Sequence, residues 1–291
     1  MILTANLFIK KKIKNEEDIR KYERDIASYI PYVDKLTIYN MTKEDLTSFY
    51  QYISKYNNIE CTDCEDLGEV NNYKRAMLQA KALNADYTVI LEQDYFYEED
   101  VFLALKRMLL EWDGELPTIL SPYPKYTCEM FSKSEVELRT VKGVRLVGTF
   151  INVEDYFLSD GFLDIYYETT FDYDYCITSR INGKKVYVAN NLVLRNRNFK
   201  ILTKKILTFE VSSYEKDPYQ LYYETRNRFY LWEKFKNLDP EYILIDKKLF
   251  KGEVKEMNIC DKMARYKRDI IEDARKDAMR GNMGKSEREI N

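Results

Sequence analysis

Runs of apolar residues alternate with amphipathic segments through the first half of the chain. Apolar runs at residues 2–9, 36–40 and 87–91 predict buried strands. The segments between and after them carry apolar residues at intervals of three and four, which predicts helices at residues 19–29, 43–55, 71–84 and 99–112. Buried strands that alternate with helices are typical of parallel sheets. The pattern therefore predicts an α/β fold with a doubly wound, mostly parallel sheet and helices on both faces.

The pattern changes in the second half of the chain. Prolines interrupt the alternation of strands and helices at residues 117–124, and the next predicted strand is at 144–152. An acidic cluster at 171–175 opens a predicted helix, and a short strand is expected at 185–189. From Asp217 onward the chain is aromatic and basic, which favours a mainly helical appendage. We therefore expect an α/β domain at residues 1–210 and a helical appendage at 211–291.

Composition excludes several classes of protein. The formal net charge of -3 lacks the basic character of a nucleic-acid-binding protein. No apolar stretch approaches the roughly 20 residues that span a bilayer, and the first residues do not resemble a secretion signal. The five cysteines are odd in number and mostly isolated, as expected for reduced thiols. We predict a cytoplasmic protein that binds no nucleic acid.

The chain contains no histidine. This absence excludes Ser-His-Asp and Cys-His catalytic groups and histidine-ligated zinc. Acid–base and metal chemistry must therefore depend on carboxylates, tyrosine, lysine or amide side chains.

Two carboxylates follow the most apolar of the predicted strands. Glu92 and Asp94, separated by Gln93, come directly after residues 87–91. Ligands of open α/β sheets bind beyond the carboxyl ends of the strands, and two such carboxylates can bridge a divalent cation to a diphosphate. The sequence predicts a site for Mn²⁺ or Mg²⁺ here; a solvated strand end is the alternative interpretation.

A second acidic pair opens the helix predicted after residue 170. Asp172 and Asp174 lie in its first turn, where the helix dipole stabilises negative charge. In a protein without histidine, Asp172 is the best candidate for the base that takes a proton from an acceptor hydroxyl. Simple helix capping by Asp172 is the alternative.

Several motifs occur in order over residues 85–231. They are A-D-Y-T-V-I-L-E-Q-D at 85–94, D-G-F at 160–162, D-Y-D-Y-C at 172–176 and Y-Y-E-T-R-N-R-F-Y-L at 222–231. Together they resemble family 2 glycosyltransferases of the GT-A fold, most closely bacterial rhamnosyltransferase-like members. The last motif is similar to the family's YYxxRNRxYL helix and is the most specific single match.

The resemblance implies roles for individual residues. Asp94 would bind the metal, Glu92 would support the metal or the ribose, and Asp172 would be the base of an inverting displacement. Asn196 stands where many relatives carry a metal-binding histidine: either Asn196 offers an oxygen ligand there, or Arg195 and Arg197 neutralise the diphosphate in place of a ligand. The residues implied to contact the nucleotide sugar are Tyr39, Asn40, Arg75, Glu92, Gln93, Asp94 and Asp174. Two departures are Glu92, in place of the family's first aspartate, and Tyr39-Asn40, in place of its D-N dipeptide.

The implied function is transfer of a sugar from a nucleoside-diphosphate donor, dTDP-rhamnose-like or a UDP-sugar, to a hydroxyl of a cell-surface polysaccharide, glycan or lipid-linked acceptor. One alternative is a non-catalytic relative that binds a nucleotide sugar or a partner transferase. Another is a nucleotidyltransferase, against which stands the lack of a glycine-rich basic loop near the first strand. For the appendage, packing on the domain, a homodimer contact and a peripheral contact with the inner face of the membrane remain open.

Overall fold

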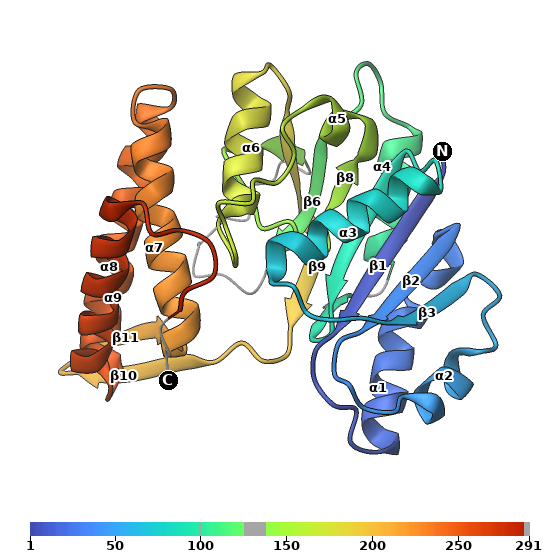
Figure 1. The fold of residues 1–291 in the computed structure, drawn as a ribbon, viewed down its shortest axis with the longest axis horizontal. Coiled ribbons are helices and arrows are strands. Elements are labelled where there is room, and N and C mark those ends of the chain that lie inside the picture. Colours follow the sequence, from blue (N-terminus) through green and yellow to red (C-terminus); the bar gives the residue numbers. More distant parts are fainter. Residues whose placement is uncertain (99, 125–137, 288–291) are drawn as a thin grey trace. The chain divides into compact units, whose positions relative to one another are not determined.

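The computed structural model describes residues 1–98, 100–124 and 138–287, and Figure 1 shows its elements. The chain divides into two compact units. The first unit comprises Met1–Leu67, Asn71–Gly161 and Thr178–Arg197. The second comprises Gly68–Val70, Phe162–Ile177 and the chain from Asn198 onward.

The first unit is built on one mixed sheet. Its strands are β1 (Leu3–Ile9), β2 (Lys35–Asn40), β3 (Ile59–Asp63), β4 (Tyr87–Glu92), β5 (Tyr95–Tyr97), β6 (Ile119–Pro124), β7 (Leu138–Thr140), β8 (Phe150–Asn152) and β9 (Val186–Asn196). Its helices are α1 (Glu16–Ala27), the short η1 (Ile30–Tyr32), α2 (Thr47–Ile53), α4 (Val101–Leu110), α5 (Val153–Leu158) and most of α3 (Glu69–Ala82). The helix α6 (Phe171–Ile181) has residues in both units.

The strand order is β3-β2-β1-β4-β8-β6-β9-β5, and β7 pairs with β9. The strands β1 to β4 are mutually parallel, as are β6 and β9, whereas β8 runs antiparallel to both of its neighbours. The chain builds outward from β1 to β3 and then returns to place β4 on the other side of β1. The boundary between β1 and β4 is therefore a topological switch point, where open α/β sheets bind ligands.

Helices cover both faces of this sheet. On one face the ring of Phe8 stacks on Tyr73 of α3, with 6.3 Å between centroids. On the other, Phe150 contacts Phe102 of α4 at 5.0 Å. The strand registers place Phe150 on the same face as Ala5, and Phe8, three residues further along β1, points to the opposite face. The predicted α/β fold with helices on both faces is confirmed.

Some elements differ from their predicted extents. No strand was predicted at β3, which is an edge strand whose mostly exposed side chains carry no apolar alternation. The strand β6 contains Pro122 and Pro124, which lack backbone N–H donors, and a register shift after Pro122 accommodates them. The helix predicted at 43–55 begins only at Thr47, and the strand predicted at 185–189 continues to Asn196. Glu99, the first residue of the helix predicted at 99–112, lies outside the described residues.

The second unit is mainly helical. It contains α7 (Pro218–Phe235), α8 (Pro240–Cys260), α9 (Ala264–Arg280) and the hairpin of β10 (Ile201–Ile206) and β11 (Phe209–Tyr214). The hairpin belongs to the same compact unit as these helices and packs on α8, where the Cys260 thiol donates to the carbonyl of Val211. No helix in the described part of the chain is long and apolar enough to cross a membrane.

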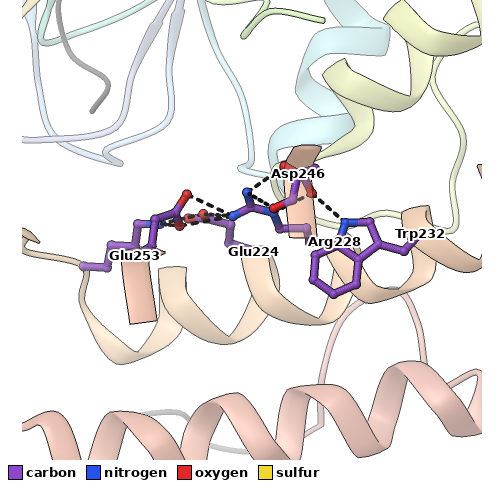
Figure 2. A network of polar contacts seen from close by, with 6 residues as sticks. Glu224, Arg228, Trp232, Asp246 and Glu253 are labelled. Atoms are coloured by element: carbon purple, nitrogen blue, oxygen red, sulfur yellow. Dashed lines mark hydrogen bonds and ion pairs between the residues drawn. The ribbon is translucent and has the colours of Figure 1, made fainter. Parts of the chain in front are cut away.

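A partly buried network of charges joins α7 to α8 (Figure 2). Arg228 of α7 donates to both carboxylate oxygens of Asp246 at 2.7 and 2.6 Å and also pairs with Glu253 at 3.1 Å. The indole of Trp232 donates to Asp246 as well, at 2.6 Å. Burial alone would raise the pKa of Glu253, but the positive charges of Lys216 and Arg228 lower it to about 2. Paired and hydrogen-bonded charges of this kind are sensitive to loss of either partner.

Candidate functional site

The predicted metal residues lie at the switch point of the first unit. Glu92 is the last residue of β4, and Gln93 and Asp94 form the turn between β4 and β5. The strand is buried up to Leu91, whereas Glu92 and Asp94 are partly exposed. The strand β4 therefore places two carboxylates at the carboxyl edge of the sheet, beside the end of β1.

Gln93 holds the segment that follows β1. Its side chain is only 6% exposed and makes two hydrogen bonds to the main chain of Lys11. The Lys11 amide donates to Oε1 at 2.8 Å, and Nε2 donates to the Lys11 carbonyl at 2.9 Å. The ammonium of Lys11 in turn lies 2.7 Å from Oδ2 of Asp94. Sequence reasoning missed Lys11, although four lysines among residues 10–14, directly after a buried strand, were a visible signal.

Asn196 joins the same turn. The antiparallel pairing of β5 and β9 places Asn196 opposite Tyr95, and the amide of Arg197 donates to the carbonyl of Asp94 at 3.1 Å. The structure thus brings the backbones of Glu92, Asp94 and Asn196 into one region. The guanidinium of Arg197 is held by Asp25 at 2.6 Å.

The oxygen atoms that these residues offer suit a metal ion that is bound partly by the protein and partly by a ligand. The described residues contain no group of three or more histidine, cysteine, aspartate or glutamate side chains that could hold a metal ion. Glu92, Asp94 and Asn196 offer two carboxylates and one amide oxygen, which are hard ligands suited to Mg²⁺ or Mn²⁺. Mg²⁺ is commonly bound by one or two carboxylates together with substrate phosphates and water. The residues present match that arrangement and not a cage made only of protein.

Tyr39 and Arg75 also lie together in the first unit. The Tyr39 ring stacks on Phe8 at 4.9 Å, and the Arg75 guanidinium lies 5.9 Å from its centroid. Burial raises the pKa of Tyr39 to about 12, so its hydroxyl is neutral at physiological pH. Arg75 also donates to the carbonyl of Glu65 at 3.2 Å. Tyr39 is only 4% exposed, so the Arg75 guanidinium is the part of this pair that suits a negatively charged ligand.

Asn40 is engaged in the turn after β2. Its Nδ2 donates to Asp63 of β3 at 2.7 Å and to the carbonyl of Glu44 at 3.0 Å. Its Oδ1 accepts hydrogen bonds from the amide and hydroxyl of Thr42. The side chain therefore shapes the turn and fixes Asp63, a carboxylate that sequence reasoning missed together with β3.

The second acidic pair lies in the second unit, in the first turn of α6. Asp172 is 1% exposed and accepts a hydrogen bond from the amide of Tyr173 at 2.9 Å. Both oxygens of Asp174 lie 2.7 Å from the ammonium of Lys234 on α7, and one also accepts from the hydroxyl of Tyr166 at 2.8 Å. Asp174, predicted to contact the nucleotide sugar, is thus engaged in joining α6 to α7.

The loop before α6 has an unusual backbone. Thr169 and Thr170 have φ of 34° and 72°, a left-handed region that β-branched residues rarely adopt. The amide of Thr169 donates to the carboxylate of Glu69 at 2.8 Å. Asn227, fully buried on α7, donates to the carbonyls of Glu168 and Thr169 at 2.5 and 3.1 Å. The helix motif at residues 222–231 therefore supplies the side chain that holds the loop leading to Asp172.

Solved structures share this architecture. GalNAc-T7, solved with UDP, GalNAc and Mn²⁺, matches with a TM-score of 0.56 and 10% identity over 96% of this chain and 56% of its own. TarS of S. aureus matches with 0.54 and 12% over 97% of this chain and 49% of its own. Its fragment 1–349 with UDP-GlcNAc matches with 0.50 and 11% over 97% and 91%. No protein-family profile and no curated protein sequence matches the chain.

These similarities define the fold as that of GT-A proteins. The chain spans about half the length of GalNAc-T7 and of the longer TarS chain. At identities of 10–12% the likeness concerns the arrangement of helices and strands and not the chemistry. Function must therefore be argued from the residues at the switch point and at the start of α6.

Proposed function

We propose that this protein is a glycosyltransferase that moves a sugar from a nucleoside-diphosphate donor to an acceptor hydroxyl. The observation that carries the proposal is the position of Glu92 and Asp94 at the switch point of a GT-A sheet, with the backbone of Asn196 opposite Tyr95 in the strand that follows. The presence of UDP with Mn²⁺ in GalNAc-T7 and of UDP-GlcNAc in TarS supports a nucleotide-sugar donor for this chain.

Asp94, with Glu92 and Asn196, would hold a divalent cation against the donor diphosphate. When bound, that cation would stabilise the negative charge that develops on the leaving diphosphate. Tyr39 and Arg75 would contact the nucleotide. These roles require side chains on fixed elements, which β4, β9, β2 and α3 provide.

Asp172 would take the proton from the acceptor hydroxyl as the oxygen attacks the anomeric carbon. Attack on the face opposite the leaving diphosphate inverts the configuration at that carbon. The loop held by Asn227 and Glu69 would fix the carboxylate for this step. A UDP-sugar or a dTDP-rhamnose-like sugar is the proposed donor, and a hydroxyl of a cell-surface polysaccharide or glycan is the proposed acceptor.

Donor binding and transfer can be tested separately. Thermal melting with a panel of nucleoside diphosphates and nucleotide sugars, with and without Mn²⁺, should reveal a donor that raises the melting temperature. Asp94→Ala should lose the Mn²⁺-dependent part of that rise. Asp172→Asn should keep it and lose transfer by a factor of about 10²–10⁴, the usual contribution of a general base.

The matched control is Asp113→Asn, which neutralises an exposed carboxylate after α4 and should change neither quantity. Full transfer activity in both Asp94→Ala and Asp172→Asn would refute the assignment. Tight donor binding with no transfer or hydrolysis at any Mn²⁺ concentration would favour a second candidate function, that of a non-catalytic nucleotide-sugar-binding protein. The observation that favours this candidate is the ion pair between Lys11 and Asp94, which occupies the proposed metal ligand.

A further inference from the structure

We propose that Lys11 is a cation built into the donor site: it neutralises Asp94 while the donor is absent and moves to the donor diphosphate when metal and donor bind. The inference rests on the proposed function and assigns a role to a residue in the segment after β1. Its starting point is the 2.7 Å contact between Nζ of Lys11 and Oδ2 of Asp94.

The main chain of Lys11 is fixed, while its side chain extends into solvent. Both ends of the buried Gln93 amide bind the Lys11 backbone, so the Cα of this residue is anchored beside the turn after β4. The Lys11 side chain is 63% exposed, whereas that of Asp94 is 13% exposed. A lysine tethered in this way can move its ammonium over several ångströms by rotation about its side-chain bonds.

Three neighbouring cations, Lys12, Arg195 and Arg197, pair with other carboxylates. Lys12 pairs with Glu44 at 2.8 Å, but both side chains are about half exposed, at 56% and 45%. The guanidinium of Arg195 pairs with Glu98, and that of Arg197 with Asp25. Among these residues, Lys11 is the one whose cationic group lies on the predicted metal-binding carboxylate.

The pair has a consequence for metal binding. An ammonium and a divalent cation repel each other, so they cannot both lie on the same carboxylate at low energy. Mn²⁺ alone should therefore bind the donor-free protein weakly, because it must displace Lys11. The negative charge of a diphosphate can bind both Mn²⁺ and the Lys11 ammonium. Mn²⁺ and nucleoside diphosphate should therefore each strengthen the binding of the other.

The test replaces Lys11 by methionine, which keeps the length of the side chain and removes its charge. Mn²⁺ binding is measured by electron paramagnetic resonance of the free ion, first without nucleotide and then with UDP or dTDP, whichever raises the melting temperature. Lys11→Met should bind Mn²⁺ about tenfold more tightly without nucleotide, as removal of a charge–charge repulsion in a solvent-exposed site predicts. It should also bind the nucleoside diphosphate more weakly in the absence of metal.

Two further variants serve as controls. Lys12→Met makes the same change of charge one residue away and should leave Mn²⁺ binding unchanged, and Lys11→Arg, which keeps the cation, should behave like the unmodified protein. Equal Mn²⁺ affinity in Lys11→Met and the unmodified protein, including absence of binding in both, would overturn the role of Lys11. If nucleoside diphosphate still binds in that case, the proposed function survives; if none binds to any variant, the proposed function fails as well.

Discussion

Replacing Asn227 by alanine should reduce turnover through the loop that leads to Asp172. The Asn227 amide donates to two consecutive carbonyls, those of Glu168 and Thr169, from a fully buried position on α7. Thr169, one of the residues that it binds, and the next residue, Thr170, have a left-handed backbone that is unfavourable for branched side chains. Such a backbone persists only where its surroundings hold it in place.

The magnitude follows from the bonds that are lost. Two buried hydrogen bonds contribute about 1 kcal/mol each, so the free energy of unfolding should fall by about 2 kcal/mol. Relaxation of the two left-handed residues, each strained by about 1–3 kcal/mol, would then move the start of α6. A displacement of about 1 Å at a catalytic group can reduce turnover about a hundredfold. We expect kcat to fall by that order while KM for the donor changes little.

Steady-state kinetics with varied donor, together with urea unfolding, measures both quantities. Asn227→Asp has nearly the same shape but loses the donor group, and it should reproduce the loss of kcat. Thr225→Ala is the matched control: Thr225 is equally buried on α7, and its hydroxyl has no hydrogen-bond partner within the described chain. It should lose stability without losing kcat. Unchanged kcat in Asn227→Ala, or the same loss in Thr225→Ala, would refute the reasoning.

Two further predictions concern stability. Gly68→Ala should lower the free energy of unfolding by more than Gly183→Ala. Both glycines have positive φ, but a Cβ at Gly68 would lie 2.5 Å from the Tyr167 ring, whereas one at Gly183 would meet no atom within 4 Å. Equal losses in urea unfolding would contradict this prediction. The pKa of Glu253, lowered to about 2 from its ordinary 4.5, implies stabilisation that is present above pH 4.5 and is lost as the pH falls toward 2. Urea unfolding over this range should show a smaller pH dependence in Glu253→Gln than in the unmodified protein, and identical pH profiles would remove Glu253 as a cause.

The sequence was sufficient to predict the strands in the central part of the sheet. The strands β1, β2 and β4 are buried on both faces, so most of their residues are apolar and form runs that a pattern can detect. The strand β3 was not predicted because it lies at the sheet edge with mostly exposed side chains. The hairpin β10–β11 was not predicted because its strands are mostly exposed and mix polar with apolar residues. Asp63 was therefore overlooked, since its position at the end of a strand depends on recognising β3.

Lys11 was overlooked for a different reason. Its contact with Asp94 joins residues 83 positions apart, and it exists because parallel β1 and β4 end at the same edge of the sheet. Local periodicity predicts each strand but not which strands are neighbours. The switch point, and with it the meeting of the lysine-rich segment and the acidic turn, follows from the strand order alone.

Polar residues that are close together in the acidic clusters at 92–94 and 172–174 have different roles, and the role of each depends on its hydrogen-bond partners. Between Glu92 and Asp94, the buried Gln93 binds the Lys11 backbone with both ends of its amide and so positions the turn, whereas Asp94, paired with the Lys11 ammonium, is the residue proposed to bind a metal ion. In the other cluster, Lys234 and Tyr166 bind Asp174, which joins α6 to α7, while Asp172 accepts a hydrogen bond from the Tyr173 amide and is the residue proposed as the base. A motif match assigns one role to the whole triplet. Only the hydrogen-bond partners divide it into residues that shape the site and residues that can act on a substrate.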